Sequence, residues 1–157
     1  MTTFILNLFL AFSWVTVTGH FEPLNFFIGF ILAYVMLWLV RSGSAPSNYF
    51  KKVQQVIGFI FFFGHELVKA NLRVAWEVIR PGHHMYPGVV AIPLDIKTDA
   101  EITMLANLIT LTPGTLTLDV SSDRKILYVH AMYIEDVDEF TRSIKEGFEK
   151  RVQEVLG

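Results

Sequence analysis

The chain has 157 residues, of which 52% are hydrophobic and only 18% are charged, and its formal net charge at pH 7 is −2. A chain of this length accommodates one domain, or a membrane anchor joined to a small domain. It contains no cysteine, which excludes a disulfide framework, thiolate chemistry and a cysteine-ligated metal site.

The N-terminal quarter consists of two apolar runs, Phe4–Thr18 and Leu24–Val40, with one carboxylate, Glu22, and no Lys or Arg. The intervening Gly19–Pro23 favours the end of one helix and the start of another. A helix that crosses ~30 Å of hydrocarbon needs about 20 mostly apolar residues. The sequence therefore predicts a transmembrane helical hairpin over residues 1–41.

Two other interpretations of this stretch are disfavoured. A buried hairpin of a soluble protein would need a polar face for water, and hardly any exists. A secretory signal peptide would need basic residues before the apolar run and a small-residue cleavage site, and both are missing.

Charge is segregated along the rest of the chain: residues 41–80 are net basic and residues 81–157 are net acidic. Cytoplasmic flanks of membrane helices are enriched in Lys and Arg. We therefore expect Arg41, Lys51 and Lys52 to be cytoplasmic. Two crossings then leave the N-terminus and the acidic C-terminal part in the cytoplasm.

Residues 48–80 are predicted to form one long helix, because Pro81 stops it. Its first part is rich in Phe and apolar nearly all round. Its second part has an apolar stripe, formed by Val68, Leu72, Ala75, Trp76 and Ile79. The opposing polar stripe consists of His65, Glu66, Lys69, Arg73, Glu77 and Arg80. The short apolar part and the basic flanks favour an embedded or interfacial helix. A third crossing is the alternative, and it would place Met1 outside.

Residues 88–157 are predicted to form a cytoplasmic β-α-β-β-α domain. The alternating strand Val89–Ile96 contains Pro93, which indicates a sheet edge, and Thr98 with Glu101 matches a capping box at the start of a helix. The remaining elements are a period-two strand at Thr115–Val120, a strand apolar on both faces at Ile126–Ile134, and an amphipathic helix from Val137 to Val155.

This order matches a ferredoxin-like unit without its last strand, in which the third strand lies between the first and the second. The fold class is thus an α+β membrane protein. One sheet face remains to be covered, and we expect a partner subunit or Lys51–Arg80 to cover it.

The sequence predicts no catalytic, cofactor or metal site. It lacks a glycine-rich phosphate loop, a nucleophile elbow and a metal-spaced cluster. The adjacent His83 and His84 would point apart, and no carboxylate joins them. His130 is interpreted as a buried imidazole, and the carboxylates of strand ends and turns as a solvated rim. The acidic domain disfavours nucleic-acid binding.

Ion carriers place ionisable residues at mid-membrane depth, and the predicted hairpin has none there. His65 and Glu66, with Lys69 beside them, are therefore the candidates for an ion path or an interface. The simpler interpretation pairs Glu66 with Lys69 and Arg73 with Glu77 at the membrane surface.

The run Leu105–Leu116 is similar to the E subunit of the multisubunit monovalent cation/proton antiporters of the Mrp, Mnh or Pha type. The similarity extends through Asp119-Val120 to His130. The opening Asn7–Trp14, the length and the two-part layout agree with that family too.

This resemblance implies a bacterial plasma-membrane complex that exchanges Na⁺ or a similar cation for H⁺. In it, large subunits related to the antiporter modules of respiratory complex I conduct the ions, and the E subunit is accessory. The expected partners are the other antiporter subunits and the bilayer, without a cofactor. We interpret the central motif as structural, at a subunit contact. Its residues are Asn107, Thr110, Thr112, Pro113, Gly114 and Thr115.

Two other functions are compatible with this layout. One is a stand-alone membrane-anchored adaptor whose cytoplasmic domain binds a soluble partner. The other, less favoured, is a small membrane enzyme that acts on lipid headgroups through His65, Glu66, His83 and His84.

Overall fold

The computed structural model describes residues 2–40, 48–79 and 86–157. The chain forms two compact units, Met1–Gln54 and Gln55–Gly157. The predicted features at Arg41, Arg80, Pro81, His83 and His84 lie outside the described residues.

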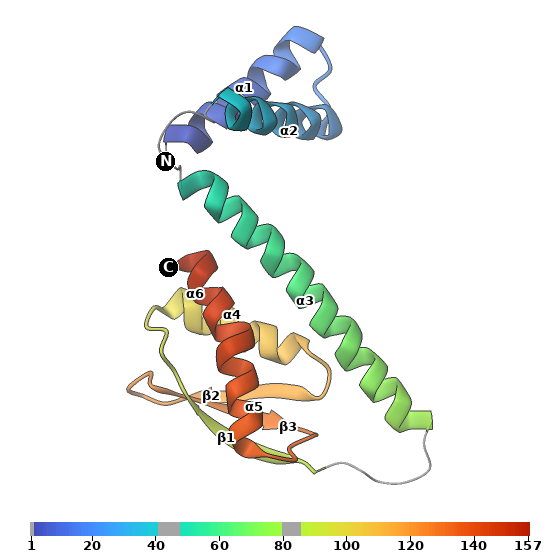
Figure 1. The fold of residues 1–157 in the computed structure, drawn as a ribbon, viewed down its shortest axis with the longest axis vertical. Helices are drawn as coiled ribbons and strands as arrows, with labels where there is room; N and C mark the ends of the chain where they lie inside the picture. The colour runs from blue at the N-terminus through green and yellow to red at the C-terminus, as the bar shows by residue number, and fades with distance from the viewer. Residues whose placement is uncertain (1, 41–47, 80–85) are drawn as a thin grey trace. The chain divides into compact units, whose positions relative to one another are not determined.

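The first unit contains the two apolar helices that the sequence predicts, α1 (Thr2–Thr18) and α2 (Pro23–Val40) (Figure 1). Gly19 ends α1 with a φ of +70°, a conformation that costs glycine nothing. Pro23 is the first residue of α2. By length and composition, α2 can cross a membrane, whereas α1 is a shorter apolar helix of 17 residues.

Small residues allow α1 and α2 to approach closely. Ala11 and Ala33 are buried, and Gly29 faces Trp14, where an added Cβ would lie 2.8 Å from the indole Cδ1 atom. By contrast, most of the large apolar side chains of both helices are exposed. This pattern of small residues inside and large apolar residues outside is typical of helices that pack within lipid.

Helix α3 (Asn48–Ile79) is a single helix of 32 residues that begins in the first unit. The amide of Asn7, which is fully buried, donates a hydrogen bond of 2.7 Å to the hydroxyl of Tyr49. The rings of Tyr49 and Phe50 lie edge-on to that of Tyr34, with centroids 5.9 and 5.2 Å away. The start of α3 is therefore held against α1 and α2 by one buried polar contact and an aromatic cluster.

The second unit contains a three-stranded antiparallel sheet covered by helices on one face (Figure 1). Its elements in chain order are β1 (Gly88–Pro93), α4 (Asp99–Leu111), β2 (Thr115–Val120), β3 (Ile126–Ala131), α5 (Val137–Ser143), a π-helical segment (Ile144–Glu149) and α6 (Lys150–Leu156). The strand order is β1-β3-β2. This order confirms the predicted central third strand and the edge position of the strand that ends at Pro93.

The helix-facing side of the sheet forms the core. Leu127 and Val129 of β3 are fully buried, as is Ile92 of β1, and Leu105 of α4 packs with them. The capping box at the start of α4 is present as predicted: Glu101 N donates to Thr98 Oγ1, and Thr98 N donates to the Glu101 carboxylate.

Several predicted elements differ in detail. The strand predicted to run from Ile126 to Ile134 ends at Ala131, and its outward face is only half-buried, including His130, which was expected to be buried. The strict alternation expected for β2 is interrupted by a register shift between Thr117 and Asp119. The single helix expected from Val137 contains π-helical turns.

Helix α3 does not cover the open face of the sheet, contrary to one of the two expectations. Phe59 of α3 belongs to the core of the second unit, and the Phe62 ring lies edge-on to that of Phe148 at 5.4 Å. The Arg151 guanidinium carbon lies 3.8 Å from the centre of the Phe62 ring. Because Phe148 and Arg151 belong to the helical layer, α3 packs on that layer.

Replacing Gly29 with Ala should lower the thermal stability of the α1–α2 hairpin. An Ala normally stabilises a helix interior by about 0.5–1 kcal/mol relative to Gly, but here its Cβ would overlap the fixed base of the Trp14 side chain. Gly58→Ala is the matched control, because a Cβ at that position meets nothing within 4 Å. The thermal midpoint in detergent is measured for both variants. An equal or higher midpoint for Gly29→Ala would contradict the close packing.

Candidate functional site

A cavity of about 340 Å³ in the second unit brings together the two groups of residues that the sequence singles out. Glu66 and Lys69 of α3 form part of one wall, and the Thr112–Thr115 turn between α4 and β2 forms part of another. The other polar residues that line the cavity are Arg73, Tyr133, Glu135, Asp136, Glu139 and Ser143. His65, Asn107 and Thr110 do not line it.

The α3 wall carries a small charge cluster. Glu66 Oε1 lies 3.6 Å from His65 Nδ1 and 3.9 Å from Lys69 Nζ. The Glu66 side chain is 26% exposed, whereas that of His65 is 75% exposed. The predicted pairing of Glu66 with Lys69 is therefore present, at a distance and exposure at which such a pair contributes little to stability.

Arg73 has a different contact from the predicted one. Its guanidinium carbon lies 5.8 Å from the centre of the Tyr133 ring, within cation–π distance. In the described part of α3, Arg73 does not form the predicted ion pair with Glu77. The contact with Tyr133 connects α3 to the segment that follows β3.

The threonines of the α4–β2 turn bond to backbone groups. Thr112 Oγ1 donates to the Leu108 carbonyl at 2.9 Å, and Thr115 Oγ1 donates to the Ile109 carbonyl at 2.6 Å. Both hydroxyls thus donate to carbonyls in the last turn of α4, where the helical hydrogen bonds end. These bonds are capping contacts of the kind expected for the hydroxyls, and the role of the motif in a subunit contact stays a prediction.

Gly114 has a φ of +91°, which places the turn in a conformation that favours glycine. A Cβ at Gly114 would lie 3.3 Å from the Tyr133 ring, and the Gly114 carbonyl accepts a hydrogen bond from Met132 N. The Pro113-Gly114 pair therefore lets the turn approach β3 and Tyr133 closely.

Asp136 begins α5 on the acidic side of the cavity. Its Oδ1 accepts hydrogen bonds from Glu139 N at 3.0 Å and Asp138 N at 2.7 Å. These two donors lower the pKa of the Asp136 carboxyl, since they favour its ionised form. The cap could have been found in the sequence, where Asp-Val-Asp-Glu precedes an amphipathic pattern.

Opposite charges therefore face the cavity from different elements. Lys69 and Arg73 come from α3, and Glu135, Asp136 and Glu139 come from the loop after β3 and from α5. Across residues 2–40, 48–79 and 86–157, no group of three or more His, Asp or Glu side chains is arranged to hold a metal ion. The arrangement suits a charged contact surface.

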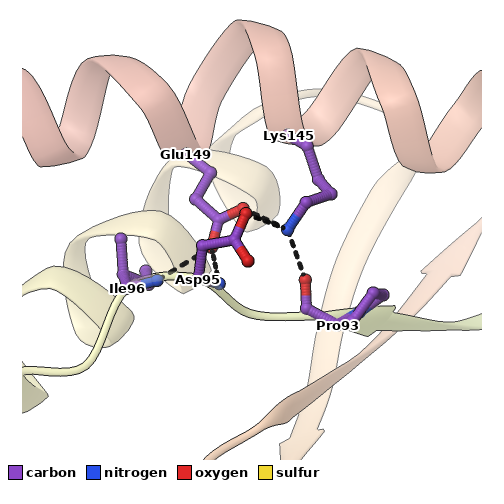
Figure 2. Close-up of polar contacts among 5 residues, drawn as sticks. All are labelled: Pro93, Asp95, Ile96, Lys145 and Glu149. Atoms are coloured by element: carbon purple, nitrogen blue, oxygen red, sulfur yellow. Dashed lines mark hydrogen bonds and ion pairs between the residues drawn. The ribbon is translucent and has the colours of Figure 1, made fainter.

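A second polar cluster, which no sequence pattern predicted, joins the end of β1 to the π-helical segment (Figure 2). The Glu149 side chain is 4% exposed, and its Oε1 accepts hydrogen bonds from Asp95 N at 2.6 Å and Ile96 N at 3.2 Å. Lys145 Nζ donates to the Pro93 carbonyl and lies within 3 Å of carboxylate oxygens of Asp95 and Glu149.

The Lys145 cluster was hidden in the sequence because Lys145 and Glu149, four residues apart, have the pattern of a solvated helix face. In the structure this face meets the backbone after Pro93. Partial burial acts to lower the pKa of Lys145, but the hydrogen bonds with Asp95 and Glu149 outweigh burial, so the pKa is raised.

The comparisons with known proteins decide the family. The family model described as "Na+/H+ ion antiporter subunit" matches residues 7–155. The chain belongs to this family. It is 42% identical to the E subunit of the Na⁺/H⁺ antiporter of Bacillus subtilis and 36% identical to that of Alkalihalophilus pseudofirmus. Each match covers 96% of both chains.

Two solved structures contain a chain that is similar to this one. A chain of the Mrp complex from Dietzia sp. DQ12-45-1b is 30% identical, with a TM-score of 0.51 over 65% of this chain and 96% of that one. A chain of the archaeal membrane-bound sulfane sulfur reductase is 25% identical, with a TM-score of 0.59 over 99% of this chain and all of that one. Both neighbours belong to membrane complexes.

Replacing Lys145 with Gln should remove a pH-dependent part of the stability. Because the folded state raises the pKa of Lys145 above its ordinary value of 10.5, the charged lysine stabilises the fold fully below that value. This contribution is lost as the pH rises through the raised pKa. We expect the variant to have a lower free energy of unfolding than the wild type at pH 8. The difference between the two free energies should narrow above pH ~10.5. Unfolding by urea is followed at both pH values.

Lys150→Gln is the control for the Lys145 experiment, because Lys150 is exposed. The lysine charge would have no role if the difference in free energy of unfolding between Lys145→Gln and wild type were the same at pH 8 and above pH ~10.5.

Proposed function

We propose that this chain is the E subunit of an Mrp-type multisubunit Na⁺/H⁺ antiporter. There it is an accessory component, needed for the assembly or stability of cation/proton exchange across the bacterial plasma membrane. The observation that carries this proposal is the match, at 42% identity over 96% of both chains, to the E subunit of an antiporter. Its partners are the other antiporter subunits and the lipid bilayer.

The accessory role is supported by the chemistry of the hairpin. Helices α1 and α2 contain no Asp, Glu, Lys, Arg or His. Proton and cation paths in membranes depend on ionisable side chains inside the bundle. Asn7, the buried polar residue of α1, donates its hydrogen bond to Tyr49 and so serves helix packing. The hairpin is thus suited to hold the protein in the complex.

The candidate residues of the cavity are better suited to a contact with a neighbouring subunit than to an ion path. Glu66 lies near His65 and Lys69, and the hydroxyls of Thr112 and Thr115 are bonded to backbone carbonyls. Lys69 and Arg73 line the same cavity, and their positive charges would repel a passing cation. The charged rim around them remains open to a partner of complementary charge.

For the topology, we propose two crossings, by α1 and α2, and a cytoplasmic C-terminal domain. The contacts of Phe62 with Phe148 and Arg151 support two crossings over three, because a lipid-spanning helix would not carry the charged helical layer of a soluble domain on its side. α3 is then the interfacial helix.

Deletion of the gene should abolish or strongly lower Na⁺/H⁺ exchange in inverted membrane vesicles, because the complex would lose a component needed for its assembly. Exchange is measured as dequenching of a pH-sensitive dye on addition of Na⁺. A plasmid copy of the gene is the control and should restore the signal. Full exchange without the protein, together with its failure to copurify with other membrane subunits, would support the stand-alone adaptor instead.

Single cysteines test the topology in the otherwise cysteine-free chain. We expect His20→Cys, in the reversal between α1 and α2, to react with a membrane-impermeant maleimide in intact cells. Gly157→Cys should react only after the cells are permeabilised. Labelling of Gly157→Cys in intact cells would overturn the cytoplasmic assignment.

A further inference from the structure

The C-terminal elements of the second unit pack against one face of α3 and leave the opposite face uncovered. Phe59 is part of the core, Phe62 lies against Phe148, and Arg73 contacts Tyr133. Glu66 also points to this side, since it lines the cavity. These contacts fix the rotation of the helix about its axis relative to the unit it packs on.

The uncovered face is a continuous apolar stripe. Its residues recur at spacings of three, four or seven, so they lie on one line along the helix. They are Ile57, Phe61, Val68, Leu72, Ala75 and Ile79, and the five large ones are between 49% and 76% exposed. Over this length the stripe extends for about 33 Å at 1.5 Å per residue. A stripe of this size is not left in water by a stable protein.

The charges of α3 favour an anionic occupant. Lys51 and Lys69 are exposed, whereas its two carboxylates, Glu66 and Glu77, are half-buried, and Arg73 faces the cavity. The long side chains of the two lysines can extend their ammonium groups from the side of the helix to an anionic surface. An amphipathic helix with this combination binds at the boundary between the headgroups and acyl chains of an anionic bilayer.

The start of α3 is tied to the membrane hairpin. Tyr49 accepts the hydrogen bond from Asn7, and its ring packs edge-on to Tyr34. Asn7 and Tyr34 both belong to the ends of α1 and α2 away from the Gly19 reversal. The helix therefore starts at the cytoplasmic end of the hairpin, where the inner leaflet meets water in the proposed topology.

We propose that the stripe from Ile57 to Ile79 lies in the inner leaflet at the level of the headgroups and upper acyl chains, with the C-terminal domain held on the opposite face of α3. The occupant of the stripe is anionic lipid. This inference rests on the proposed membrane topology and adds to it which residues enter the lipid. It makes α3 a support that fixes one side of the C-terminal domain towards the membrane.

Spin labels on single cysteines test the inference in the whole complex, reconstituted in nanodiscs of phosphatidylglycerol and phosphatidylethanolamine. Labels replace Phe61, Val68 or Leu72 on the stripe. Collision of each label with oxygen, which dissolves in lipid, is compared with collision with a water-soluble nickel complex. The reference positions are Asp123→Cys for water, Ala70→Cys for the domain-facing side and Ile31→Cys for the hairpin surface. Complex with no introduced cysteine gives the background.

We expect the oxygen-to-nickel collision ratio at the three stripe positions to exceed the ratio at Asp123 several-fold. Low collision with both reagents would show that another protein of the complex covers the stripe, and a water-like ratio would show that it is exposed; either result overturns the inference. If the collision ratio is high at Ile31 but not at the stripe, only this inference fails. If the ratio at Ile31 is as low as at Asp123, the proposed topology fails. Exchange activity of the labelled complexes reports assembly separately.

Discussion

The packing of α3 against the helical layer of the C-terminal unit is the contact on which the rest of the structure depends. Phe59 is part of the core, and Phe62 contacts both Phe148 and Arg151. Burial of large aromatic side chains is among the strongest contributions to such a contact. Once one face of α3 is committed in this way, its opposite, apolar face is turned outward, and Glu66, Lys69 and Arg73 are turned towards the cavity.

Two polar clusters position the helices of the C-terminal unit. Glu149 binds the backbone where β1 ends, and Lys145 neutralises it. Glu101 and Thr98 cap α4. Buried charges are tolerated only when paired and hydrogen-bonded, so these contacts specify geometry. The Lys145–Glu149 cluster connects the end of the edge strand, at Pro93, to the helical layer.

The α1–α2 hairpin packs by a different rule. Its two helices approach through Gly29, Ala11 and Ala33 and expose their large apolar residues. Its polar contacts, such as Trp14 Nε1 with Asn25 Oδ1 at 3.0 Å, connect one helix to the other. The hairpin is thus uncharged, and the charged side chains of the described residues lie in α3 and the C-terminal unit.

The sequence alone determined much of the fold. The apolar runs, the capping box and the period-two strand predicted the elements, and the proline in the first strand placed that strand at the edge. These are local signals, since each depends on residues a few positions apart. The family was also recognisable from the Leu105–Leu116 run.

The tertiary structure decided what local patterns cannot specify. It brought Glu66 and Lys69 to the same cavity as the Thr112–Thr115 turn, and it gave Arg73 a contact with Tyr133 in place of Glu77. It also turned Glu149 from an ordinary helix-surface residue into a buried acceptor. A helical pattern shows which residues share a face, but which partner meets that face depends on packing between segments far apart in the chain. For α3, that packing chose the helical layer over the open sheet.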